Sequence, residues 1–104
     1  MDNKEYKLRY LPVFSEDLNE AVSYIAGKLH NPQAAKKLLD DTESAILERL
    51  QAPCAYQPYA SAAEREYPYY RINIRNYSVF YVVIGDVMEV RRFLYSKRDL
   101  VNLL

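Results

Sequence analysis

The segment spanning residues 77–95 constrains the fold of this 104-residue chain more than any other part. Residues 77–84 are rich in β-branched and aromatic side chains on both faces, which predicts a central strand covered on both sides. Gly85 and Asp86 then form a two-residue hairpin turn, and residues 87–95 form the returning strand. The rest of the chain must supply elements that pack against this hairpin.

Two amphipathic helices are predicted before the hairpin. The first is expected to have Ser15 as its N-cap, and its apolar residues recur at spacings of three and four: Phe14, Leu18, Ala21, Val22, Ile25, Ala26 and Leu29. The second is expected to begin at Asn31 and Pro32, a capping residue followed by proline in the first helical turn. Because the connection is short, we expect the two helices to form an antiparallel hairpin.

Three further segments complete the expected order. Residues 6–13 alternate loosely and predict a first strand, whereas residues 51–68 have no clear period and predict a loop. Residues 69–75 alternate again and predict a strand, and Ser96 starts a capping-box pattern for a short final helix. The order β-α-α-β-β-β-α predicts one α+β domain over residues 1–104, with the helical hairpin packed on a mainly antiparallel four-stranded sheet.

Composition narrows the class of protein. The chain is 50% hydrophobic and 27% charged, as is usual for folded globular domains. It has neither a signal-peptide pattern nor an apolar run near the roughly 20 residues of a membrane helix, so a soluble cytoplasmic protein without a membrane partner is expected. The single cysteine, Cys54, and single histidine, His30, allow no intrachain disulfide and suggest no metal cluster. No metal and no cofactor are therefore expected.

Basic residues gather in the last third of the chain although the net charge is zero. Residues 69–104 contain six Lys or Arg against three Asp or Glu, and several of the 11 tyrosines lie among these arginines. Arginine offers a fixed fork of donors to phosphate, and tyrosine offers a flat face to unpaired bases. The same residues are equally compatible with core tyrosines and with surface ion pairs, so both interpretations stay open.

Five short motifs follow one another along the chain: Phe14-Ser15-x-x-Leu18, Asn31-Pro32-x-Ala34-Ala35, Glu66-Tyr67-Pro68-x-Tyr70-Arg71-Ile72, Asn76-Tyr77-x-Val79-x-Tyr81 and Leu94-Tyr95-Ser96-Lys97-Arg98-Asp99-Leu100. In this order they resemble the RelE/ParE family of bacterial toxins over nearly the whole length. The resemblance implies the toxin of a type II toxin–antitoxin system, a plasmid-stabilisation type of module, which is held inactive by its cognate antitoxin in a hetero-oligomer.

The resemblance implies two alternative targets. RelE- and YoeB-like members cut mRNA on the ribosome without metal, by driving the ribose 2′-hydroxyl onto the neighbouring phosphate, and this endoribonuclease activity is the slightly favoured expectation. ParE-like members share the fold and instead inhibit DNA gyrase, with no known chemistry of their own. A third alternative is a degenerate binding module that is not toxic.

The nuclease alternative assigns roles to four residues by resemblance. Arg71 matches the strand arginine that contacts the phosphate, Tyr95 matches the tyrosine near the C-terminus, and Arg92 lies at the same arginine-containing strand end. The glutamate base would be Glu64 or Glu66, of which Glu66 is taken as the candidate. Leu94 stands where YoeB-like toxins carry a histidine.

Two further groups of residues are expected to bind partners. Arg75, Arg91, Lys97 and Arg98 would bind RNA or its phosphates if they share a face. In the expected final helix, Leu100, Leu103 and Leu104 are spaced i, i+3 and i+4, so they share a side that could receive the antitoxin.

Overall fold

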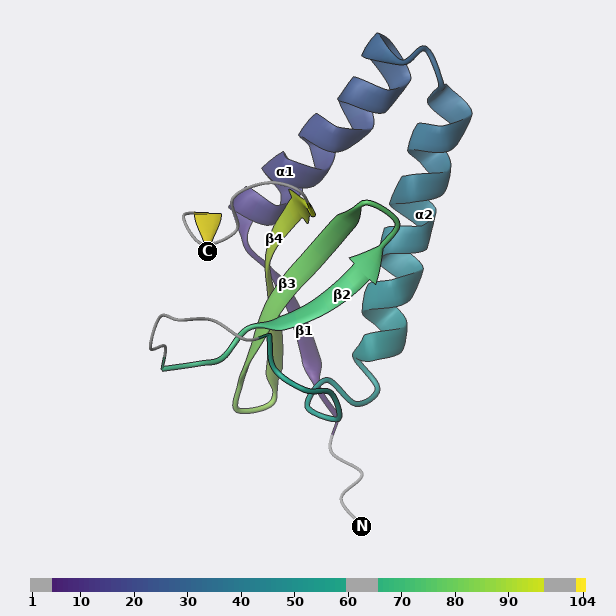
Figure 1. The fold of residues 1–104 in the computed structure, drawn as a ribbon. Coiled ribbons are helices and arrows are strands. Elements are labelled where there is room, and N and C mark those ends of the chain that lie inside the picture. The colour runs from purple at the N-terminus through teal and green to yellow at the C-terminus, as the bar shows by residue number, and fades with distance from the viewer. Residues whose placement is uncertain (1–4, 60–65, 97–102) are drawn as a thin grey trace.

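A computed structural model describes residues 5–59, 66–96 and 103–104 and shows two helices packed against one face of a four-stranded mixed sheet (Figure 1). The elements are β1 (Lys7–Tyr10), α1 (Pro12–Ser23), the π-helical segment η1 (Tyr24–Lys28), α2 (Pro32–Arg49), β2 (Tyr70–Ile74), β3 (Tyr77–Ile84) and β4 (Val87–Tyr95). This is the α+β class predicted from the sequence. The final helix predicted from Ser96 falls largely on residues 97–102, outside the described part of the chain.

The start of α1 corrects the sequence prediction. The helix begins at Pro12 rather than after Ser15, and β1 is correspondingly limited to Lys7–Tyr10. Leu11 is the N-cap, with extended backbone angles and no side-chain capping bond. Proline is well suited to the first helical position, because its φ angle is already helical and its missing N–H is not needed there. This preference outweighed the capping tendency of Ser15.

The helical hairpin turns where the sequence predicts it. The Oδ1 atom of Asn31 accepts a hydrogen bond of 3.0 Å from the backbone N–H of Ala34, which confirms Asn31 as the cap of α2. Before this cap, the first helix loosens into the wider turn of η1, which contains Gly27. The end of the hairpin projects beyond the sheet in Figure 1.

The sheet has the strand order β1-β4-β3-β2. β1 runs parallel to β4, and the other two pairs are antiparallel. Gly85 adopts a φ of 62° in the β3–β4 turn, which confirms the predicted hairpin. In β4 a bulge adds one residue, because Phe80 pairs with Arg92 while its neighbour Tyr81 pairs with Val90.

β3 is buried on both faces, as its sequence predicts. On the helix side, Val79 and Tyr81 belong to the main core with α1 and α2. On the other side, Phe80 and Val82 form a smaller apolar cluster with Leu94, covered by side chains of the loop and the C-terminus: Tyr59, Tyr67, Leu103 and Leu104. The sheet therefore has a helix face and a helix-free face, each with its own core.

A buried hydroxyl in α2 yields a prediction about stability. The Oγ1 atom of Thr42 is buried and has no hydrogen-bond partner among the described residues, and the residue is 1% exposed. Thr42→Val keeps the shape and removes the unsatisfied group, so we expect the free energy of unfolding to rise by about 1 kcal/mol. Thr42→Ser is the control, because it keeps the hydroxyl and removes a methyl group. Chemical denaturation that ranks the serine variant above the valine variant would contradict this account.

Candidate functional site

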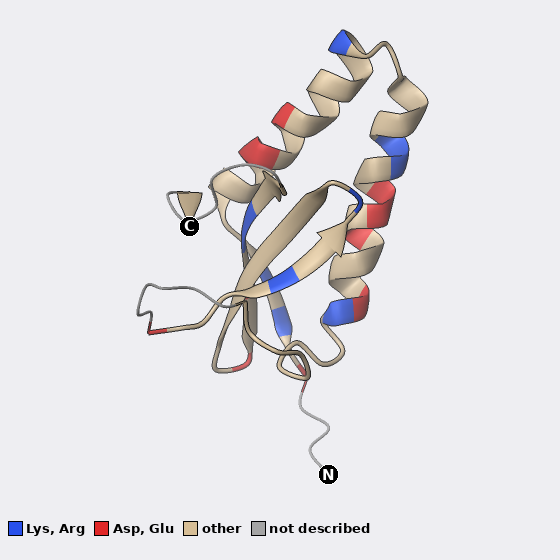
Figure 2. Ribbon diagram, in the orientation of Figure 1, with Lys and Arg blue, Asp and Glu red and all other residues tan. Residues whose placement is uncertain are grey.

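Arginines of the three strands β1, β2 and β4 face the helix-free side of the sheet, as the strand register shows. Figure 2 marks the basic positions along these strands in blue. Arg71 of β2 and Arg92 of β4 both pair with Phe80, whose side chain belongs to the cluster on this face. Neighbouring strands lie about 4.8 Å apart, so these two arginines flank Phe80 with their Cα atoms roughly 10 Å apart. We refer to Arg9, Arg71, Arg91 and Arg92 as the arginine face.

Glu89 joins two of these arginines. Its side chain is only 8% exposed, and it accepts bonds from Arg9 (Nη2 to Oε2, 2.6 Å) and from Arg91 (Nε to Oε1, 2.8 Å). Burial alone would raise the pKa of Glu89, but the hydrogen bonds and charges of the two arginines lower it below its ordinary value. One carboxylate balances only one of the two guanidinium groups, so this triad leaves one positive charge on the face.

Asp17 holds Arg92 at the open edge of β4. The pairing of β1 with β4 ends at Tyr10 and Val90, and among the described residues no strand pairs with this edge of β4 beyond that point. Asp17 of α1 accepts the backbone N–H of Phe93 at 3.1 Å, and its two oxygens accept the fork of Arg92 at 2.7 and 3.0 Å. This carboxylate raises the pKa of Arg92 above its ordinary value. The third nitrogen of Arg92 donates to the carbonyl of Leu103, so the guanidinium is fully engaged.

Arg71, unlike Arg92, is held by a hydroxyl group rather than by a carboxylate. Its Nε donates to Oγ of Ser78 at 2.8 Å, within a polar cluster that also contains Asn73 and Ser96. Its guanidinium lies 5.4 Å from the ring centre of Tyr59. Among the described residues no carboxylate lies within ion-pair distance of Arg71, so its terminal nitrogens can receive an anionic group.

Tyr95 lies on the opposite face. It pairs with Tyr77, and the two ring centres are 5.6 Å apart on the helix side of the sheet. There it lines a pocket of about 190 Å³ together with Asp17, Glu20 and Tyr24. The structure therefore separates Tyr95 from Arg71 and Arg92, which the mRNA-cleavage hypothesis requires to act together.

Leu94 occupies the position where YoeB-like toxins carry a histidine. Its side chain is on the arginine face, but it is only 1% exposed and packs in the cluster with Phe80. An apolar side chain at position 94 can neither donate nor accept a proton. Glu66, the candidate base, is an exposed residue of the loop before β2.

The remaining predicted residues are divided between different places. Arg91 is on the arginine face, whereas Arg75 lies in the β2–β3 turn and pairs with Asp41 of α2. Leu103 and Leu104 pack against the apolar cluster of the helix-free face. Glu64, Lys97, Arg98 and Leu100 fall outside the described residues.

Sequence reasoning missed Arg9, Asp17 and Glu89. Arg9 meets Glu89 only through the parallel pairing of β1 with β4, and Asp17 meets Arg92 across 75 positions of the sequence. Such long-range pairings leave no local periodic signal. An acidic residue amid the apolar strand 87–95 was the available hint, because a buried carboxylate needs a cationic partner.

Within the described residues, no helix is long and apolar enough to cross a membrane. In the same part of the chain, no group of three or more His, Cys, Asp or Glu side chains is arranged to hold a metal ion.

The helical hairpin packed on a mixed sheet is the fold of a small toxin domain of the RelE/ParE type, and comparison with known families supports this class. The family model described as the ParE toxin of the type II toxin–antitoxin system parDE matches residues 8–100, and the chain belongs to this family. The match covers every described helix and strand except the start of β1.

Two solved structures have folds similar to that of this chain. A chain of the chromosomal ParDE toxin–antitoxin system from P. aeruginosa is similar with a TM-score of 0.68 and 18% identity, over 90% of this chain and 99% of that one. YafQ from E. coli strain BL21(DE3) is similar with a TM-score of 0.48 and 17% identity, over 86% of this chain and 92% of that one. No curated protein sequence matches the chain.

Asp17 is predicted to be a major stabilising residue. Asp17→Asn removes the charge that binds Arg92, so we expect the free energy of unfolding to fall by about 1.5–3 kcal/mol. Glu16→Gln is the matched control at an exposed position of the same helix, and it should change stability by less than about 0.5 kcal/mol. Equal stability of the two variants in urea denaturation would show that the Asp17 contacts contribute little.

Glu89 is predicted to make stability depend on pH. Its folded-state pKa lies below the ordinary 4.5, so its contribution is complete above that pH and is lost as the pH falls through the lowered pKa. Glu89→Gln should therefore destabilise the protein at pH 7 and flatten the acid side of the stability profile. Thermal unfolding between pH 3 and 7 measures this, and parallel profiles for the two proteins would exclude Glu89 as the cause.

Proposed function

We propose that this toxin acts by inhibiting DNA gyrase through binding, rather than by cutting mRNA. Membership of the ParE family supports this choice, because gyrase inhibition is the action that the ParE-like resemblance implies. The observation that carries it is the placement of Arg71 and Tyr95 on opposite faces of the sheet. The action would take place in the cytoplasm, where gyrase works.

Three features argue against assembled nuclease chemistry. Transfer of the 2′-hydroxyl proton needs a base and an acid within hydrogen-bond reach of one reacting phosphate. Tyr95 is on the other face, Leu94 is apolar and buried, and Arg92 is bound by Asp17. A cutting reaction would require Arg92 to leave Asp17 and Tyr95 to cross the sheet edge, and both changes would break the contacts described above.

The arginine face suits binding to an anionic target. Arg71 has no described carboxylate partner, and the Arg9–Glu89–Arg91 triad retains one positive charge. Such a face would attract the acidic surface or the DNA of a gyrase–DNA complex, and it requires no catalytic group. The antitoxin would oppose this action by binding the toxin first, and Leu100, Leu103 and Leu104 stay candidates for part of its contact surface.

Two substitutions distinguish gyrase inhibition from mRNA cleavage. Arg71→Ala should weaken growth inhibition about ten- to a hundredfold, because a charge-assisted contact is worth roughly 1.5–3 kcal/mol. Tyr95→Phe should leave growth inhibition within about twofold, since the lost hydroxyl lies on the other face and a phenylalanine fills the same space. A nuclease that uses Tyr95 for proton transfer would lose activity in both variants.

The direct test compares the two targets with purified wild-type toxin. We expect inhibition of plasmid supercoiling by gyrase in a reconstituted assay, and intact mRNA in a ribosome-containing translation extract analysed by primer extension. Cleaved mRNA with normal supercoiling would refute the proposal in favour of the nuclease. Inactivity in both assays, with growth unaffected, would favour a non-toxic binding module.

A further inference from the structure

A pocket of about 270 Å³ lies between the helical hairpin and the β2–β3 turn. Ile25 of η1 and Ala34 and Leu38 of α2 provide apolar walls, and Lys37 and Arg75 bring cationic side chains to the same pocket. A cavity of about 150 Å³ is enough to bind benzene in other proteins, so this space can hold a branched aliphatic or aromatic side chain. It lies apart from the arginine face, on the helix side of the sheet.

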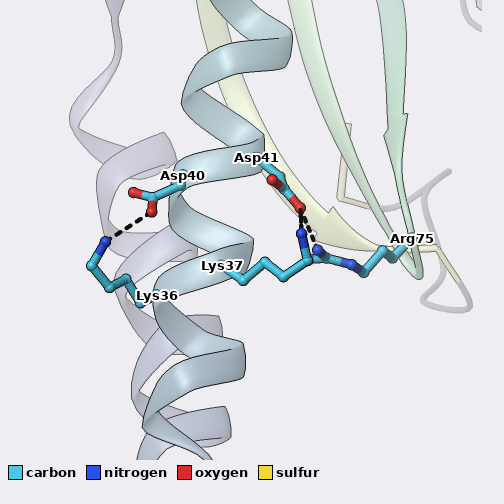
Figure 3. A network of polar contacts seen from close by, with 5 residues as sticks. All are labelled: Lys36, Lys37, Asp40, Asp41 and Arg75. Carbon is cyan, nitrogen blue, oxygen red and sulfur yellow. Dashed lines mark hydrogen bonds and ion pairs between the residues drawn. The ribbon is translucent and has the colours of Figure 1, made fainter.

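The polar side of the pocket has more positive than negative charge. Lys37 and Arg75 both pair with the same oxygen, Oδ2, of Asp41 (Figure 3). One carboxylate therefore serves two cations, and a single positive charge is left among these three residues. The neighbouring pair of Lys36 and Asp40 is balanced and points away from Arg75 (Figure 3). The pocket thus offers one unbalanced cation beside an apolar cavity.

The backbone around the pocket departs from regular structure in two places. Arg75 adopts a φ of 54°, in the left-handed region that favours glycine or asparagine. Its guanidinium pairs with Asp41 of α2 (Figure 3). Ile25 lies on the π-helical turn of η1, a type of irregularity that is frequent at functional sites. Both departures affect residues that line the pocket.

We propose that this pocket binds an acidic segment of the antitoxin. An apolar side chain of the segment enters between Ile25, Ala34 and Leu38, and a carboxylate next to it in the segment pairs with Lys37 and Arg75. The charge imbalance favours an anionic partner over a neutral one, and the cavity favours a segment that carries an apolar side chain beside the acid. The proposal rests on the assignment of the chain as a toxin with an antitoxin partner, and it is independent of which target the toxin attacks.

Isothermal titration calorimetry at 0.1 M salt tests the pocket. The titrant is the full-length protein encoded by the reading frame adjacent to the toxin gene, and its dissociation constant for the toxin is measured. Lys37→Gln should raise the dissociation constant about three- to fivefold, whereas Lys36→Gln, with the same change of charge one residue away, should change it by less than about 1.5-fold. Ala34→Phe fills the cavity and should weaken binding by more than about tenfold. Gln33→Phe introduces the same side chain at the exposed neighbouring position and should leave the dissociation constant unchanged. Circular dichroism serves as the control that all four variants are folded.

Asp41→Asn gives a result of opposite sign. If Asp41 competes with the partner's carboxylate, its neutralisation should tighten binding several-fold, and 0.5 M salt should reduce this gain. Tight binding by the wild type with Ala34→Phe and Lys37→Gln unchanged overturns the proposal, as does an equal loss in Lys36→Gln. Failure of the wild type to bind that protein also overturns it. A toxin that does not inhibit gyrase but binds this protein as described would refute the gyrase proposal and support the pocket proposal. The two proposals are therefore tested separately.

Discussion

The contact between Asp17 and the edge of β4 joins the helical layer to the sheet at the point where strand pairing ends. β1 covers β4 only as far as Val90, so the next residues would present unpaired backbone groups and an isolated arginine. One carboxylate satisfies the N–H of Phe93 and the fork of Arg92 together. This interaction holds α1 against the end of β4 and makes Arg92 unavailable for a phosphate.

Beyond Arg92, the residues of β4 alternate between the two faces of the sheet. Phe93 is fixed toward the helices, so Leu94 turns toward the arginine face and Tyr95 turns back, because side chains alternate along a strand. The side chain that could transfer a proton is thereby placed away from the arginines. Among the described residues, the arginine face thus has several cations without Tyr95 beside them, an arrangement that suits the binding role proposed above.

Local signals in the sequence were sufficient for most of the fold. The Asn31 cap, the Gly85 turn and the doubly apolar strand 77–84 each depend on neighbouring residues, and each is found where it was predicted. The predicted cap at Ser15 was wrong because two local preferences compete at the start of α1. The preference of Pro12 for the first helical turn prevailed over the capping preference of Ser15. The site was less predictable. Most of the arginines were identified from the sequence, but their carboxylate partners Asp17 and Glu89 come from distant segments or depend on long-range pairing. In addition, the bulge in β4 determines which face Arg91 and Arg92 occupy, and no local pattern indicates it.

That bulge has a consequence for how such a chain can change in evolution. Arg91 is the extra residue of β4, since its neighbours Val90 and Arg92 pair with the consecutive residues Tyr81 and Phe80. Loss of one residue elsewhere in the strand would exchange its two faces, whereas loss of Arg91 would leave every other side chain facing as before. A lineage can therefore gain or lose an arginine here by a change in length alone. The strength with which the surface attracts an anionic partner can then drift while the core keeps its packing.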